Sequence, residues 1–105
     1  SIQGNVSDLS ISSNTASLNP DIASFYTLQL VPSTATHLVA ASVKPGLTVS
    51  VKVATTGSGT LNLSSQFKQP SGSAYTATST TGVDILTFVS FDSTAYYLTS
   101  VKNLI

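Results

Sequence analysis

Apolar and polar residues alternate along short segments of this chain, and this period of two limits the possible folds more than any other feature. In the clearest segment, residues 47–53, four aliphatic side chains take one face while Thr48, Ser50 and Lys52 take the other. A segment with this pattern is a half-buried β-strand. It follows the pair Pro45–Gly46, which favours a tight turn.

The same pattern predicts further strands, each bounded by residues that favour turns. They are expected over residues 9–11, 16–18, 25–31, 36–43, 60–64, 74–78, 83–91 and 95–101. Hairpin connections are expected at 55–59 and at Asp92–Ser93–Thr94. No segment of about ten residues has helical spacing, and no internal repeat of fixed period is visible. About eight short strands predict an all-β fold, as an antiparallel β-sandwich or barrel.

The length of 105 residues fits one domain and leaves no room for a second. We expect a single domain over residues 1–105, with 1–6 and 103–105 as arms that could lie on neighbouring molecules. The chain has no cysteine, so neither a disulfide nor a thiolate metal site can stabilise it.

Charged residues are scarce. The chain has four Lys and four Asp, no Arg and no Glu, and its formal net charge is zero. Such a composition lacks the basic surface that nucleic-acid binding requires, and no apolar run approaches the roughly 20 residues of a membrane-spanning helix. Ser and Thr are abundant instead. This surface suits a protein packed against neighbours, although a Ser/Thr-rich secreted domain remains an alternative.

Residues able to carry catalysis are few. His37 is the single histidine, and it is expected on the polar face of the strand 36–43. No Gly-x-Ser-x-Gly elbow or phosphate loop is present. We therefore predict no enzyme activity, no catalytic residues and no cofactor.

The four aspartates lie far apart and lack the Asp-x-Asp spacing of a calcium loop, so no metal site is predicted. Asp21 and Asp92 are expected to cap turns through their side chains. Asp84 is unusual because it shares a strand face with Leu86 and Phe88. It is expected to accept hydrogen bonds from the preceding turn.

Both faces of the strand 83–91 are apolar. One side carries Val83, Ile85, Val89 and Phe91. The other side carries Leu86 and Phe88 together with Asp84. A strand of this kind lies either in the middle of a core or at an interface.

The second half resembles a β-rich module of tailed-bacteriophage virion structural proteins, of the capsid-decoration and tail-fibre type. The resemblance covers about residues 18–103, and the residues that carry it are 43–49, 57–61, 82–92 and 96–98. The chain departs from the module at Ser93, where Gly is usual, and at Tyr96, where Trp is usual. A weaker likeness, to cadherin-like β-sandwich repeats, rests on residues 9–12, 18–20 and Tyr26.

The resemblance implies a non-enzymatic structural protein at the virion surface, and the size of the chain favours a small capsid decoration (cement) protein. Its expected partners are the major capsid protein or other virion proteins and further copies of itself, plausibly as a trimer, with neither nucleic acid nor a membrane as a partner. Apolar residues at the two ends and one in the 83–91 strand are the expected assembly contacts. These are Ile2, Val6, Phe91, Leu104 and Ile105.

Two other functions stay open, and both place the chain outside the cell or at the cell surface. A tail-fibre or adhesin module would bind a host glycan through surface aromatics, for which the candidates are Tyr75, Tyr96 and Tyr97. A subunit of a surface filament would instead exchange strands with its neighbours.

Overall fold

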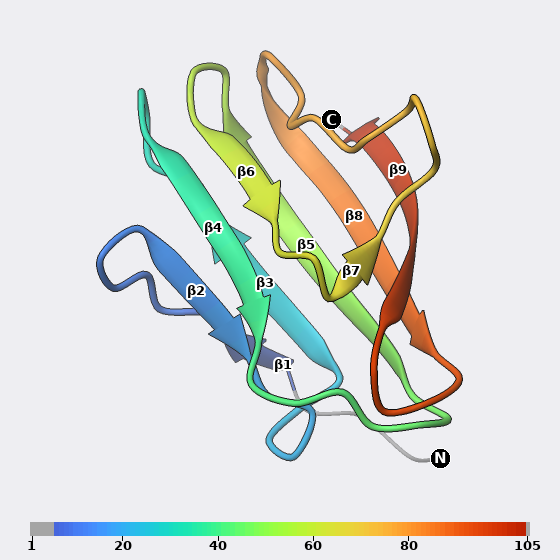
Figure 1. Cartoon of the computed structure of the whole chain (residues 1–105). Coiled ribbons are helices and arrows are strands. Elements are labelled where there is room, and N and C mark those ends of the chain that lie inside the picture. The colour runs from blue at the N-terminus through green and yellow to red at the C-terminus, as the bar shows by residue number, and fades with distance from the viewer. Residues whose placement is uncertain (1–5, 105) are drawn as a thin grey trace.

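A computed structural model describes residues 6–104, which form two β-sheets and no helix (Figure 1). The prediction of an all-β fold is confirmed. The nine strands are β1 (Val6–Asp8), β2 (Thr15–Leu18), β3 (Phe25–Gln29), β4 (Ala35–Ala40), β5 (Thr48–Thr56), β6 (Thr60–Leu63), β7 (Phe67–Lys68), β8 (Thr81–Ser90) and β9 (Tyr96–Leu104).

Successive strands from β1 to β6 alternate between the two sheets. Sheet A has the order β1-β3-β5-β8-β9-β7, and sheet B has the order β2-β4-β6. Strands that are two apart in the sequence therefore become neighbours, and they pair in parallel. The chain winds through three coils of two strands each, in the manner of a β-solenoid (Figure 1).

The expected antiparallel sandwich or barrel is therefore wrong in strand direction and connectivity. Antiparallel pairing is confined to β5 with β8 and β8 with β9 among the named strands of the described chain. The predicted hairpin at 55–59 is also wrong, because β5 and β6 belong to different sheets. The cause is that a two-layer fold gives every strand the same in–out alternation, whether its neighbours run parallel or antiparallel.

The core lies between the sheets and is made by the alternating residues that sequence analysis assigned to one face of each strand. In β5 these are Val49, Val51 and Val53, each with no exposed surface. Opposite them lie fully buried residues of sheet B such as Leu18 and Leu38. Burying such aliphatic side chains contributes about 1.5–3 kcal/mol each relative to exposure.

Sheet B has three strands and sheet A has six, and the short strand β7, which pairs with β9, is drawn in front of β8 (Figure 1). Three aromatic side chains fill this part of the core. The ring centroid of Phe67 lies 4.6 Å from that of Phe88 and 5.7 Å from that of Tyr96. The loop 69–80 covers the rest, and its Tyr75 belongs to the same core cluster.

Two predicted strands are absent from the described structure. Residues 74–78 belong to the covering loop, because their backbone is held by side chains: the Tyr75 amide donates to Gln69 Oε1 (2.7 Å) and the Thr78 amide to Asp84 Oδ2 (2.9 Å). Residues 9–11 follow β1 and form no named strand. The predicted hairpin at 92–94 is confirmed, since it joins the antiparallel strands β8 and β9.

Candidate functional site

The outer face of sheet A, which points away from sheet B, carries most of the exposed apolar side chains. Cross-strand pairs put its outward residues in rows. One row runs Val6, Phe25, Ser50, and the next runs Asp8, Thr27, Lys52, Ile85, Val101. Apolar and polar residues therefore share this face, and its two halves differ.

The first half, called here the β8–β9 half, is mainly apolar, with the threonine pair Thr87–Thr99 in its middle. Phe91, Tyr97 and Val101 are 77%, 47% and 57% exposed, and the Phe91 and Tyr97 rings meet edge to face at 6.1 Å. Val101 pairs with Ile85, and Leu104, which is 42% exposed, pairs with Val83. Exposed apolar side chains gathered on one face in this way are typical of a protein–protein interface.

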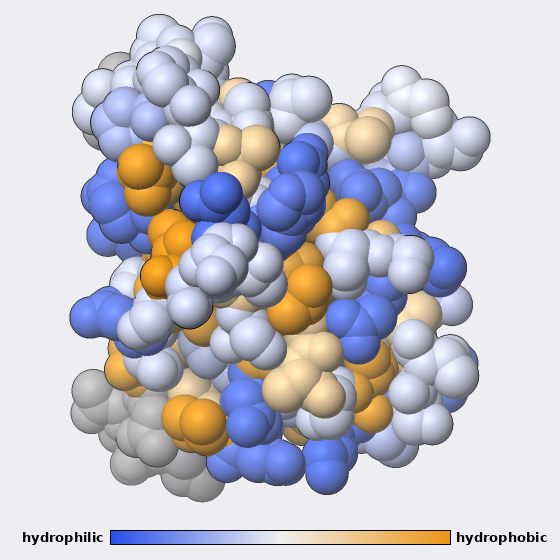
Figure 2. Space-filling model, turned by 60° about the vertical axis from the view of Figure 1, so that its left-hand side comes forward, coloured by the Kyte–Doolittle hydropathy of each residue, from blue (hydrophilic) through white to orange (hydrophobic). Residues whose placement is uncertain are grey.

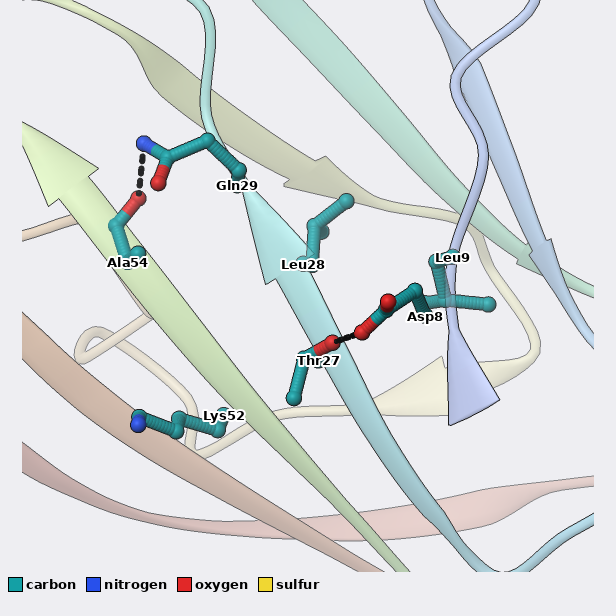
Figure 3. Close-up of a pocket in the computed structure, with 7 residues that line it drawn as sticks. All are labelled: Asp8, Leu9, Thr27, Leu28, Gln29, Lys52 and Ala54. Atoms are coloured by element: carbon teal, nitrogen blue, oxygen red, sulfur yellow. Dashed lines mark hydrogen bonds between the residues drawn. The ribbon is translucent and has the colours of Figure 1, made fainter. Parts of the chain in front are cut away.

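The second half, called here the β1–β3–β5 half, is a groove with a polar end, whose lining residues are drawn in Figure 3, and an apolar end. The polar end has a volume of about 430 Å³ and is lined by Asp8, Thr27, Gln29 and Lys52 among others. The apolar end, of about 360 Å³, is lined by Val6, Phe25 and Ile85 and shares Thr27 and Lys52 with the polar end.

The charged groups of this half are not paired with each other. The Thr27 hydroxyl donates a hydrogen bond to Asp8 Oδ1, and the Lys52 side chain extends away from that pair (Figure 3). Asp8 and Lys52 are the charged residues of β1, β3 and β5, and both are exposed. In the described chain the ion pair within 4 Å joins Lys44 to Asp21 instead (3.4 Å).

On the side of the molecule where β1 and β2 lie, the exposed apolar residues are scattered rather than gathered. Figure 2, which turns the left-hand side of Figure 1 forward, shows apolar residues interspersed among polar ones. In the turn between β2 and β3, Ile22 is 63% exposed. Single exposed apolar residues of this kind are common on soluble proteins.

Three of the five predicted assembly contacts lie in the described residues. Val6 and Leu104 are exposed within β1 and β9, and Phe91 is exposed just after β8, so all three lie on the outer face of sheet A. Asn103 and Leu104 continue β9, and Leu104 pairs with Val83 of β8, so these two residues do not leave the sheet as an arm. Of the expected arm 1–6, Val6 belongs to β1, whereas residues 1–5, which include Ile2, lie outside the described residues, as does Ile105.

Two of the three predicted surface aromatics are buried, which corrects that expectation. Tyr96 has no exposed surface and stacks on Phe67, while Tyr75 is 8% exposed and donates its hydroxyl to Asp84. Tyr97 is exposed, because it alternates with Tyr96 along β9. Phe25 was not among the predicted contacts, although alternation with Tyr26 and Leu28 places its ring on the outer face.

Asp84 is fully buried, and it anchors the covering loop to β8 and β9. Its Oδ2 accepts from the Tyr75 hydroxyl (2.7 Å) and the Thr78 amide (2.9 Å). Its Oδ1 accepts from the Thr78 hydroxyl (2.5 Å) and from the Asn103 amide (2.9 Å). Asp84 accepts hydrogen bonds as expected, but the donors are not in the turn expected at residues 81–82: they are Tyr75 and Thr78 of the loop 69–80, with a further bond from Asn103 near the C-terminal end of β9.

The Asn103 contact depends on a local irregularity of the β8–β9 ladder. The register shifts between Val83 and Ile85, opposite the end of β9, and Asn103 has a left-handed φ of 60°. Asparagine tolerates this conformation better than most residues. The bulge turns the Asn103 amide toward Asp84, so the carboxylate closes the end of the hairpin.

Burial by itself would raise the pKa of Asp84, but the hydrogen bonds from Thr78, Asn103 and Tyr75 outweigh it and hold the pKa below its ordinary value. Burial, together with the hydrogen bond to Asp84 and its negative charge, raises the pKa of Tyr75. The pair is thus a protonated phenol that donates to a carboxylate. It is a structural contact, because all four of the carboxylate's donors belong to the fold itself.

The lowered pKa of Asp84 predicts a loss of stability in acid. A carboxylate with a depressed pKa stabilises the fold fully above its unfolded pKa, near 3.9, and this contribution is lost as the pH falls through the folded-state pKa. The free energy of unfolding, measured by urea denaturation from pH 7 to pH 2, should fall below about pH 4. An unchanged midpoint across this range would contradict the role given to Asp84.

The other candidate groups take no part in a common site. His37 is exposed on β4, as the alternation predicted. Asp92 caps its turn by accepting from the Thr94 hydroxyl and amide, which lowers its pKa, and so confirms the predicted capping. For Asp21 the prediction is wrong, because Asn19 Oδ1 accepts the Asp21 amide (2.9 Å) in that turn.

Within residues 6–104 no three His, Asp or Glu side chains lie close enough to share a metal ion. The same residues include no helix of the length and apolarity that crossing a membrane requires. No family model matches the chain, and neither a curated protein nor a solved structure matches it.

Proposed function

We propose that the chain is a non-enzymatic structural protein that is built into a larger protein assembly through the β8–β9 half of its outer face. The observation that carries this proposal is the exposed apolar surface of Phe91, Tyr97 and Val101 on one face. Leaving such a surface in water is unfavourable by about 25 cal/mol for each Å² that a partner could cover. Its packed aromatic pair resembles the anchors that dominate protein interfaces.

The assembly we propose is a phage virion, with the chain as a capsid decoration protein bound to the major capsid protein. This choice is supported by the likeness of residues 82–92 and 96–98 to virion modules, and those residues form most of β8 and the start of β9. The proposed interface therefore lies on the hairpin that carries the likeness. Low charge fits such a subunit, because few charged groups would lose their hydration on packing.

The two alternatives have less support. A glycan site loses two of its three aromatic candidates, since Tyr75 and Tyr96 are buried. Strand exchange is not required by the fold, because each of the nine strands of the described chain pairs with another strand of the same chain.

Electron microscopy of the native assembly, with an antibody against the chain, tests the location. Label on phage heads is the expected result. Label confined to tails, filaments or cell surfaces would contradict the decoration role.

Changing Phe91 and Val101 to Ser should weaken binding to genome-free capsids by about 10-fold or more, because apolar anchors carry most of an interface's energy. Co-sedimentation with capsids measures the occupancy. The matched control is Ile22→Ser, which removes a similarly exposed aliphatic side chain outside sheet A. Equal occupancy for the double variant and the control would refute this interface.

A further inference from the structure

The β1–β3–β5 half of the outer face carries one positive and one negative charge in a single row. Asp8 of β1 pairs with Thr27 of β3, and Thr27 pairs with Lys52 of β5. The two charged residues are therefore two strands apart, or about 10 Å, with β3 midway between them. Both are exposed, and neither takes part in an ion pair within the described chain.

We propose that this half binds a second copy of the chain, related to the first by a twofold axis that runs along β3. Such an axis lays the two outer faces on each other and exchanges β1 with β5. Asp8 of each copy then lies opposite Lys52 of the other, so one contact produces two ion pairs. A twofold interface must be self-complementary, and this row has that property.

The apolar residues of the same half fit this arrangement. Phe25 lies on β3 and is 48% exposed, so the axis brings it against its own counterpart. The neighbouring Val6, which is 67% exposed, is covered as well. Aromatic pairs in contact contribute about 0.5–1.5 kcal/mol beyond the area that they bury.

A second copy explains the charges better than an unrelated protein does. An unrelated partner would need its own acidic and basic groups at a matching spacing, whereas a copy of this chain supplies them by symmetry. The net charge of zero also adds no overall repulsion between copies. The contact involves three of the six strands of sheet A, so the dimer should be weak and should depend on concentration.

This inference rests on the proposed function only in treating the outer face of sheet A as an interface. It uses the half that the β8–β9 contact leaves free. A dimer of this kind would present two β8–β9 surfaces, and so would bind a repetitive partner surface at two points.

Charge exchange tests the proposal. Sedimentation velocity between about 10 µM and 1 mM should show the mass of the wild-type chain rising toward that of a dimer. Asp8→Lys alone and Lys52→Asp alone should each weaken dimerisation by about 10-fold or more, since each places like charges opposite one another. The doubly exchanged chain should dimerise like the wild type.

A mixture of the two single variants gives the sharper result. One variant has only positive groups in the row and the other only negative groups, so the mixture should form a heterodimer although neither variant dimerises alone. The control Lys68→Asp, on β7, should leave the equilibrium unchanged. A wild-type monomer at about 1 mM, or a mixture that stays monomeric, would overturn the proposal. Capsid binding by a monomeric chain would leave the proposed function standing.

Discussion

Replacing Asp84 by Asn should lower the free energy of unfolding by about 3 kcal/mol, although the two side chains have nearly the same shape. Each carboxylate oxygen accepts one backbone amide, that of Thr78 or that of Asn103. In either orientation the asparagine NH₂ group would face one of these amides, and a backbone N–H cannot reverse its direction. The side-chain NH₂ group and that backbone N–H, both hydrogen-bond donors, would then face each other in the core without an acceptor.

Urea denaturation and thermal melting measure this effect. For a domain of about 100 residues a loss of 3 kcal/mol corresponds to a fall in Tm of roughly 15 °C. The matched control is Tyr75→Phe, which removes one of the four donors and leaves the carboxylate in place. It should cost about 1 kcal/mol. Similar losses for the two variants would show that the carboxylate is not needed as such.

The Asn variant also connects stability with pH. It should lose most of the acid sensitivity expected of the wild-type chain, because the group that titrates is gone. A small dependence should remain from Asp92, whose pKa is also lowered by its turn. If the variant retained the full acid sensitivity, the titrating group would lie elsewhere.

The second large effect is expected at Gly59, where alanine should cost about 2–4 kcal/mol. A Cβ atom there would lie 2.4 Å from the carbonyl oxygen of Val31, which is backbone and cannot rotate away. Two loops meet at this point: the Ser33 amide donates to the Ser58 hydroxyl (3.0 Å), and the Thr60 amide donates to the Thr34 carbonyl (2.9 Å). The added methyl group would force these stacked loops apart.

Gly72→Ala is the control for this prediction. Gly72 has a left-handed φ of 75°, and nothing lies within 4 Å of a Cβ placed there. Its substitution should cost only the conformational strain of about 1–2 kcal/mol. Urea denaturation of both variants separates steric contact from backbone strain, and a smaller loss at Gly59 than at Gly72 would contradict the contact between the loops.

The strands could be predicted from the sequence largely because alternation is a local property. Residues 48–53 lie in β5 and 83–90 in β8, as their patterns indicated. Asp84 was also predictable as an acceptor, since a charged residue on an apolar face needs partners. Its bond from Asn103 was not predictable, because it depends on a bulge where the start of β8 meets the end of β9.

The parallel coiling left no trace in the sequence for a physical reason. Val6 pairs with Phe25, 19 residues later, whereas Phe25 pairs with Ser50, 25 residues later. The unequal coils hide the repeat that marks a solenoid with regular turns. The row that joins Asp8 to Lys52 on the outer face could not be predicted either, because these residues are 44 positions apart and come into one row only through β3.

The alternation of β1 to β6 between two sheets also restricts how this protein can change in length. Because the strands alternate between the sheets, inserting or deleting a single strand would move every later strand to the opposite sheet. If the change fell between β5 and β8, the strand that carries Asp84 would then lie in the sheet opposite its antiparallel partner β5. In that part of the chain strands can therefore be added or lost only in pairs, as whole coils, and a chain with one more coil would be taller while β8 and β9 kept their antiparallel pairing.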